Sequence, residues 1–518
     1  LPDNSDKIKH TTPNPVANAN WAQEILWGWD STPGVVGVWA ERNGRVTLWR
    51  RIPQSGDTGA LVREQTRFHP WALLPSLDGL RAAGIRHEPQ PDSQSQFSHV
   101  GPETIWVQEL TGRGRLRYLV SAPHADILER ALRQALTVTL ARPIQRLGDV
   151  GPDDLLLLPL EEQYLMRSGV VYFRGLRWQD VHRLTFDLET EGLDANRHRV
   201  FLIAVRDNRG LSCTLDVAEH AAHGSNEEAA EADLIRRFVA LVRAHDPDVL
   251  ENHNIAGFDL PFLMTRAAHL GVPLSLQRAG LPPPFFRRAA PRRAWGAWGQ
   301  NDASDDSTGQ RRVGRLMAPG REIIDTLDAV WRYDFSMRSL PGHGLKAVAR
   351  AFDVARTDRE YIEGAQVGAM WRVDPDRVRR YAGDDVEEAA AISALLGGPA
   401  FALAQMAPRR YERVAETGPA TGLLDPLIVR AYLHAGAALP AYRPASMRER
   451  VQAPDDDEDD TDEDVESHSG GATYLFAAGV ARHVVKCDIA SLYPSLIRQH
   501  RISPQRDTLG VFLTLVDQ

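Results

Sequence analysis

The chain has 518 residues with a net charge of −9, and it has no apolar run of the roughly 18 to 20 residues that a membrane helix needs. This length predicts about two to four domains. Cys213 and Cys487 are too few for a disulfide framework or a cysteine-based metal site, which favours a reducing, cytoplasmic compartment.

The acidic excess is local, because ten acidic residues and no basic ones lie within residues 455–466. This run predicts a solvated linker. Of the basic residues, 56 are Arg and four are Lys. A GC-rich genome accounts for most of this bias, while phosphate binding by Arg requires independent support.

The first 165 residues predict a mostly β domain with helices. Residues 35–51 place Asn43 and Gly44 between β-rich arms, which indicates a hairpin. A second hairpin is predicted from segments 105–110 and 116–122, with helices at 76–83 and 125–140.

Residues 182–396 predict an α/β domain with a mixed sheet. Strands are expected at 183–188, 200–207 and 211–217, followed by a helix at 227–244, a strand at 248–252 and a helix after Asp259. Residues 282–320 interrupt the pattern with prolines, arginines and tryptophans. Contact with single-stranded nucleic acid and a plain surface loop both fit that segment. Residues 399–450 look helical, and a strand pattern returns at 484–489.

Period-two alternation over residues 184–190 places Asp187 and Glu189 on the same face of one strand. Two like charges side by side on a central strand are unfavourable unless a cation or a shared proton relieves them. Taken alone, Asp-x-Glu is common at solvent-facing strand ends.

Asp259 lies beyond the end of the 248–252 strand, where open α/β sheets place their sites. It is also the expected N-cap of a helix running to Gly271. The alternative is that Asp259 only caps that helix while Asn254 closes a turn.

Asp374, Pro375 and Gly397 predict the ends of a further helix. Asp385 falls beside its apolar stripe, and Tyr381 lies one turn away. The alternative is an exposed acidic face shared with Glu387 and Glu388. Taken together, the four carboxylates and the tyrosine suit two Mg²⁺ or Mn²⁺ ions bound through oxygen, as in phosphodiester cleavage.

The order of these segments resembles the three exonuclease motifs of the family B DNA polymerases. The first motif matches Asp187 and Glu189, the second Asn254, Phe258 and Asp259, and the third Tyr381 and Asp385. The resemblance implies a ribonuclease-H-like 3′→5′ exonuclease domain over residues 166–398, in which the four acids bind metal and Tyr381 positions the attacking water. Asn254 and Phe258 would contact substrate. Residues 313–325 and 344–349 resemble family segments lying between the second and third motifs.

Asp488-Ile-Ala-Ser-Leu-Tyr-Pro-Ser resembles the first palm motif of the same family. The resemblance implies that Asp488 binds the catalytic metals and that Tyr493 lies beneath the incoming sugar. It further implies a helical connector at 399–450, an acidic linker at 451–470 and the start of a palm at 471–518.

The second palm carboxylate of the family has no counterpart before Gln518, and the chain begins at Leu1 rather than Met. We therefore expect a piece of a longer or split polymerase that does not synthesise DNA by itself. The resemblance implies primer-template DNA and deoxynucleoside triphosphates as partners, no membrane, and a nucleoid-associated location in a bacterium. The alternatives are a non-catalytic DNA-binding or assembly subunit and a stand-alone ribonuclease.

Overall fold

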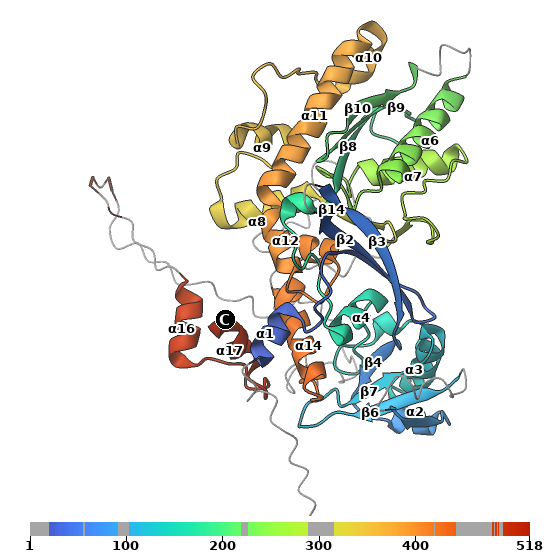
Figure 1. The fold of residues 1–518 in the computed structure, drawn as a ribbon, viewed down its shortest axis with the longest axis vertical. Coiled ribbons are helices and arrows are strands. Elements are labelled where there is room, and N and C mark those ends of the chain that lie inside the picture. Colours follow the sequence, from blue (N-terminus) through green and yellow to red (C-terminus); the bar gives the residue numbers. More distant parts are fainter. Residues whose placement is uncertain are drawn as a thin grey trace, which may run out of the picture.

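A computed structural model describes residues 20–54, 57–91, 103–218, 226–287, 315–418, 420–441 and 491–518, together with positions 479, 480, 482, 483 and 485. Its larger sheets follow one another along the long axis (Figure 1). A five-stranded sheet lies at one end, a three-stranded sheet in the middle and a four-stranded sheet at the other end. The predicted strand at 484–489, the acidic linker and most of the 282–320 segment fall outside the described residues.

The three-stranded sheet is β1 (Val35–Ala40), β2 (Arg45–Gln54) and β3 (Asp57–Arg67), in that order. The predicted hairpin is confirmed, because β1 and β2 pair antiparallel across the turn at Asn43 and Gly44. Gly44 has a φ of +78°, a conformation that glycine adopts at little cost.

The four-stranded sheet has the order β4 (Trp71–Leu74), β7 (Tyr118–Ser121), β6 (Ile105–Glu109) and β5 (His87–Pro89). The second predicted hairpin is β6 paired antiparallel with β7. Helices α2 (Asp78–Ala82) and α3 (Ala125–Thr139) share a hydrophobic core with this sheet. The predicted helices at 76–83 and 125–140 are therefore present.

The five-stranded sheet has the order β10 (Ser212–Asp216), β9 (Val200–Asp207), β8 (Arg183–Thr190), β11 (Val249–Asn252) and β14 (Glu322–Asp325). Strands β8, β9 and β10 are antiparallel, whereas β8, β11 and β14 are parallel. The sheet is mixed, as predicted, and β8 lies at its centre.

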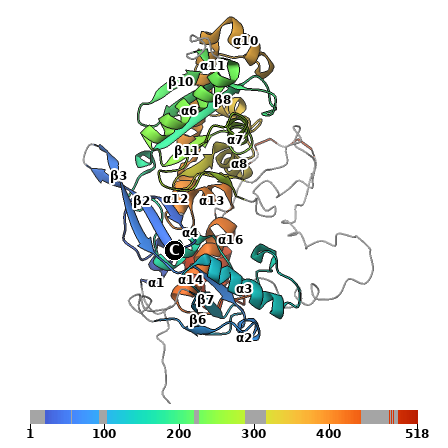
Figure 2. The same ribbon diagram turned by 90° about the vertical axis from the view of Figure 1, so that its right-hand side faces the viewer.

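Helices cover both faces of this sheet. On one face, α6 (Glu227–His245) and α7 (Asp259–His269) pack against the apolar side chains of β8. On the other face, α11 (Pro375–Leu396) packs against Leu202 and Ala204 of β9. Helices α8 (Thr326–Met337), α9 (Leu345–Ala351) and α10 (Val367–Val373) lie around α11 (Figures 1 and 2).

The middle of the molecule is one core built from distant parts of the chain. Side chains of β1 and β2 pack with those of α4 (Leu160–Ser168), α12 (Gly398–Ala404) and α13 (Tyr411–Glu416). Helices α1 (Trp21–Trp27) and α14 (Asp425–His434) pack beside α17 (Val511–Asp517), which contacts α16 (Leu492–His500). A short ribbon pairs β12 (Phe285–Phe286) with β13 (Leu316–Met317).

Among the described helices, none alone is long and apolar enough to cross a membrane, although α11 and α12 pass that test as a pair bent by 51°.

Candidate active site

Strand β8 carries two carboxylates on the face that meets α11. Leu184, Phe186 and Leu188 point into the core formed with α6 and α7. Asp187 and Glu189 therefore share the opposite face, as their spacing predicts. Glu189 is 7% exposed, so it is not the solvent-facing end of a strand that the alternative interpretation required.

Helix α11 brings a third carboxylate to this pair. Its N-terminus is capped as predicted, because the Asp374 side chain accepts a hydrogen bond from the backbone N–H of Arg377 at 3.0 Å. Val378, Ala382 and Val386 pack on β9, and Asp385 thereby faces β8. One carboxylate oxygen from each of Asp187, Glu189 and Asp385 lies within 4.8 Å of the others.

The predicted alternative for Asp385, an exposed acidic face, is wrong. Asp385 is 6% exposed and Glu388 only 2%. Glu388 points inward because it lies one turn from Asp385 on the buried side of the helix. Only Glu387 of that acidic run is substantially exposed, with 42% of its side chain accessible.

Asp259 joins the three acids through an asparagine. The Nδ2 of Asn252, the last residue of β11, donates to Asp187 Oδ1 at 2.8 Å and also hydrogen-bonds Asp259. Asp259 is buried and is not part of the group of three oxygens. Asn252 was missed at the sequence level, although its place at the end of a parallel strand is a usable signal.

The prediction that Asp259 is the N-cap of its helix is wrong. Asp259 is the first residue of α7, Phe258 occupies the cap position, and no side-chain capping bond forms there. The helix ends at His269 rather than Gly271. The Asp259 carboxylate does not cap the helix. Its Oδ1 is buried and has no hydrogen-bond partner among the described residues.

The loop between β11 and α7 is held by another aspartate. Asp325, at the end of β14, accepts hydrogen bonds from the backbone N–H groups of Asn254 at 2.8 Å and Ala256 at 3.3 Å. Asn254 closes a turn with a φ of +64°, as the alternative interpretation expected, and its side chain is exposed. Phe258 packs against Phe262 with the rings tilted by 47° and their centroids 5.3 Å apart. Neither Asn254 nor Phe258 belongs to the group of acids.

Crowding of buried carboxylates raises their pKa values. Burial and then the Asp385 charge raise the pKa of Asp187 to about 7. Burial and then Asp187 raise the pKa values of Glu189 and Asp259 well above their ordinary range. Burial also raises the pKa of Asp385, although Lys346 and Arg359 oppose it. A bound cation would therefore stabilise the ionised form of these carboxylates.

The donor set fits a divalent cation bound through oxygen. The buried oxygens Glu189 Oε1, Asn252 Oδ1 and Asp259 Oδ1 have no hydrogen-bond partner among the described residues. Buried polar atoms normally have a hydrogen-bond partner, so these three oxygens are available to bind an ion or a water molecule. Carboxylate and amide oxygens are the ligands that hard cations such as Mg²⁺ prefer.

Lys346 is the second residue that the sequence did not assign. Its Nζ donates to the Tyr381 hydroxyl, lies 4.3 Å from the centre of the Tyr381 ring and is 3.9 Å from Asp385 Oδ2. Burial and then the Asp385 charge raise the pKa of Tyr381, so its hydroxyl keeps its proton. The signal was the rarity of lysine, since only four occur in the chain.

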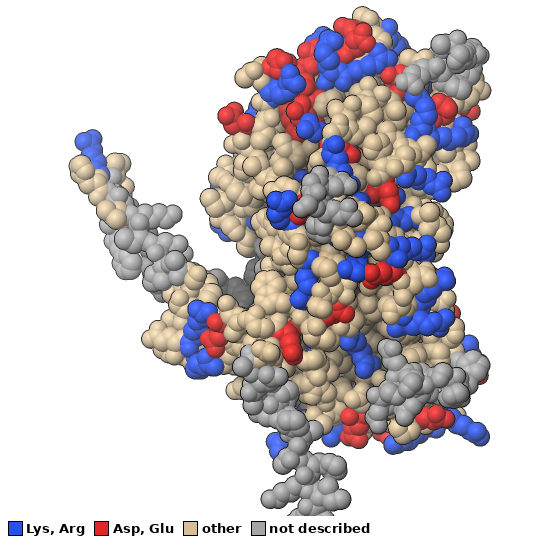
Figure 3. Space-filling model, viewed as in Figure 1, with Lys and Arg blue, Asp and Glu red and all other residues tan. Residues whose placement is uncertain are grey.

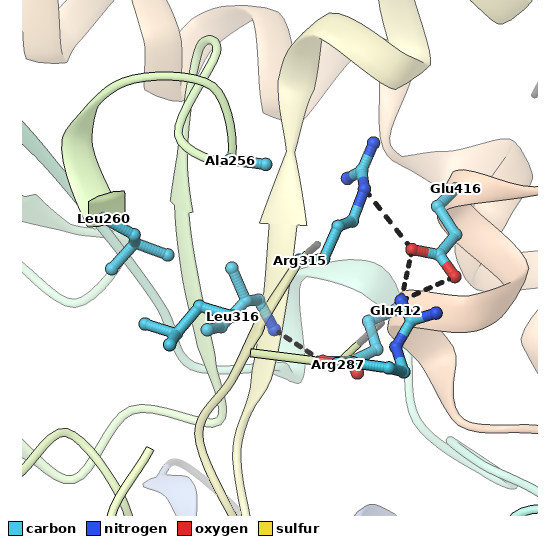
Figure 4. A pocket seen from close by; sticks show the side chains of 8 residues that line it. Ala256, Leu260, Arg287, Arg315, Leu316, Glu412 and Glu416 are labelled. Carbon is cyan, nitrogen blue, oxygen red and sulfur yellow. Dashed lines mark hydrogen bonds and ion pairs between the residues drawn. The ribbon is translucent and has the colours of Figure 1, made fainter. Parts of the chain in front are cut away.

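A small pocket behind the β11–α7 loop is closed by a separate set of charges (Figure 4). Arg287 and Arg315, on the two arms of the β12–β13 ribbon, both reach Glu416 of α13, at 2.6 and 3.4 Å. Burial acts to raise the pKa of Glu416, but these arginines and Arg413 outweigh it and hold that pKa low. Because Glu416 is already paired with these arginines, we interpret the pocket as a structural contact between the β12–β13 ribbon and α13.

Of the two predicted palm residues, only Tyr493 is among the described residues, and it does not join the acids. Asp488 lies outside the described residues. Tyr493 is on α16 with 72% of its surface exposed, and α16 lies far along the molecule from α11 (Figure 1).

Comparison with known proteins finds a family that resembles part of this chain. Residues 179–348 match the family described as DNA polymerase family B, exonuclease domain. DNA polymerases of Pyrococcus glycovorans and Thermococcus gorgonarius are 25% and 26% identical to the chain over 373 and 364 residues. Each alignment covers 68% of this chain and 40% of the relative, so the chain spans well under half the length of these relatives.

The fold agrees with these matches. The structure of the family B DNA polymerase of Pyrobaculum calidifontis superimposes with a TM-score of 0.53 at 20% identity, over 79% of this chain and 51% of that one. The likeness to that structure concerns the fold. Residues 179–348 of this chain are therefore similar to the exonuclease domain of the family B DNA polymerases.

Proposed function

We propose that the acids on β8, α7 and α11 catalyse the metal-dependent removal of nucleotides from the 3′ end of single-stranded or frayed DNA. The observation that carries this proposal is the convergence of oxygens from half-buried Asp187 and from buried Glu189 and Asp385 within 4.8 Å. Such a charge concentration is costly without a cation. We propose Mg²⁺ or Mn²⁺, with two ions in the working site.

The four acids and Asn252 would hold these cations. Bound divalent cations supply Lewis-acid activation of water and stabilisation of the leaving oxygen. Asn252 fixes the orientation of Asp187 by donating to its Oδ1. Lys346 orients the Tyr381 hydroxyl, which supports the proposal that this hydroxyl positions the attacking water.

DNA as the substrate is supported by the distribution of charge. On the face seen in Figure 3, positive side chains recur along one edge over the length of the molecule, although the net charge is −9. Arginine and lysine side chains bind the phosphate backbone without reading its sequence. We further propose that the complete protein synthesises DNA on a primer-template from deoxynucleoside triphosphates and that Asp488 is one of its palm ligands.

The test is hydrolysis of a 5′-labelled single-stranded oligonucleotide by the purified chain in Mg²⁺ or Mn²⁺. We expect stepwise shortening by wild type and none by the double variant Asp187→Ala, Glu189→Ala. The control is Glu227→Ala with Glu228→Ala, which removes the same charge from the exposed first turn of α6. If the Asp187→Ala, Glu189→Ala variant shortens the oligonucleotide as fast as wild type, the proposed catalytic role of these acids is wrong. DNA binding without metal binding or hydrolysis would instead favour a non-catalytic subunit.

A further inference from the structure

Arg359 lies in the segment between α9 and α10 and contacts Asp385, one of the three grouped acids Asp187, Glu189 and Asp385 (the acid cluster). Its side chain is 1% exposed and pairs with two acids of α11. The guanidinium donates to Asp385 Oδ1 and, through Nη2, to Glu388 Oε2 at 3.1 Å. It also lies over the rings of Tyr361 and Tyr381, at 4.6 and 5.5 Å from their centres.

The two acids need a shared cation. Asp385 and Glu388 are three residues apart on one buried face of a helix, where like charges repel. Arg359 relieves that repulsion and is itself nearly neutralised by Glu388. Its fork is planar and rigid, so a carboxylate bound to it has few orientations left.

The direction in which Asp385 is held matters for the site. Arg359 occupies Oδ1, while Oδ2 is the oxygen that lies 3.9 Å from Lys346 Nζ. Glu388 alone engages both Nε and Nη2 of Arg359 and would suffice to anchor the segment to α11. The additional contact with Asp385 is therefore not required for anchoring, and its effect is to restrict the orientation of the Asp385 carboxylate.

We propose that Arg359 is a positioning residue that fixes the Asp385 carboxylate in the orientation that binds a divalent cation. This role rests on the function proposed above. Partners of this kind orient the groups that touch the metal, and their loss typically weakens metal affinity by about 10- to 100-fold.

The experiment is titration of the whole chain with Mn²⁺, followed by electron paramagnetic resonance of free Mn²⁺ and checked by calorimetry. We expect Arg359→Lys to weaken Mn²⁺ binding by about 10- to 100-fold, because lysine lacks the planar fork that engages Glu388 through both Nε and Nη2 while Nη2 also reaches Asp385. Glu388→Gln should weaken it less, because Arg359 remains but loses its anchor. In an Asp385→Asn background, Arg359→Lys should add almost nothing.

The matched control is Arg266→Lys. Arg266 is a buried fork in the same domain, paired through Nε and Nη2 with both oxygens of Glu231 and contacting none of the four acids. We expect this variant to lower the melting temperature while leaving Mn²⁺ affinity at the wild-type value.

The outcomes separate the two proposals. Wild-type Mn²⁺ affinity in folded Arg359→Lys would overturn the positioning role and leave the proposed function standing. If Arg359→Lys does not fold, wild-type affinity in Glu388→Gln would overturn it in the same way. If the wild-type chain shows no Mn²⁺ site that is lost in the Asp187→Ala, Glu189→Ala variant, the proposed function fails, and the role of Arg359 fails with it.

Discussion

The two ends of strand β11 carry buried aspartates with opposite surroundings. Asp248, before the strand, is 0% exposed and pairs with Arg51 at 2.9 Å and Arg278 at 2.7 Å. Asp259, after the strand, is 2% exposed and interacts with the Asp187 charge and the Asn252 side chain. Burial acts to raise both pKa values, but the two arginines hold the pKa of Asp248 below its ordinary value, whereas that of Asp259 is raised well above it.

The difference teaches how to separate a structural acid from a functional one. The Asp248 end joins β2 of the three-stranded sheet to the five-stranded sheet, and its acid is paired by arginines of the chain itself. The Asp259 end lies at the carboxyl ends of the parallel strands, where such folds place their sites, and Asp259 forms no ion pair with a described residue. Both aspartates are equally buried, so the charge of the neighbouring side chains distinguishes them.

The largest effects should come from neutralising each aspartate in turn. Asp259→Asn should reduce hydrolysis by about 100-fold or more while leaving the free energy of unfolding unchanged or higher, because it removes a repulsive charge. Asp248→Asn should lower that free energy by roughly 3–5 kcal/mol, because two buried arginines lose their partner. Denaturant unfolding and the oligonucleotide assay measure both. Equal loss of stability in the two variants would contradict the comparison.

Added metal should sharpen the comparison by acting at one end only. Because the proposed cation site forms only in the folded chain, Mn²⁺ at a concentration of 100 Kd should stabilise the wild-type chain by about 2.7 kcal/mol, and EDTA should reverse the gain. Asp248→Asn should gain as much as wild type from its lower starting point, whereas Asp259→Asn should gain less. Melting curves with and without Mn²⁺ measure this, and an equal gain in Asp259→Asn would break it.

The smallest effect is a pH dependence of stability in EDTA. The pKa of Asp187 is about 7 in the folded protein against an ordinary 3.8, so the folded state binds this proton more tightly than the unfolded state does. Its ionisation therefore lowers the stability of the folded chain progressively as pH rises from 3.8 to about 7. The stability of Asp187→Asn relative to wild type should rise over that window.

The stability that Asp248 contributes should have the opposite sign. Its folded pKa is held low, so the contribution is present above its ordinary pKa and is lost as pH falls below it. The deficit of Asp248→Asn should therefore shrink on acidification. Parallel pH profiles for Asp187→Asn and Asp248→Asn would contradict the assignment of opposite surroundings.

Local pattern was enough for much of the fold. The strand at Val200–Asp207 has the predicted bounds, and α11 begins at Pro375 after the predicted cap at Asp374. Alternation and helix signals report on neighbours along the chain, and these elements depend mainly on such neighbours. For the same reason the sequence could place Asp187 and Glu189 on one face of β8.

Other features depend on contacts between distant segments and could not be read from local pattern. Lys346 meets Tyr381 across 35 residues, and Asn252 meets Asp187 across 65. The cap expected at Asp259 was wrong because Phe258 takes that position and leaves the carboxylate free for the cluster.

The sequence by itself determined the elements, the face of β8 that carries two acids and the order of the motifs, since these follow from spacing along the chain. The tertiary structure alone decided which acids remain without a counter-charge. Asp248 and Asp259 are both acids beside the same strand. Only the packing of Arg51 and Arg278 at one end, and of Asp187 at the other, makes the first a joint and the second part of the proposed cation site. Electrostatic energy depends on distance in space, which the spacing of residues in the chain does not fix.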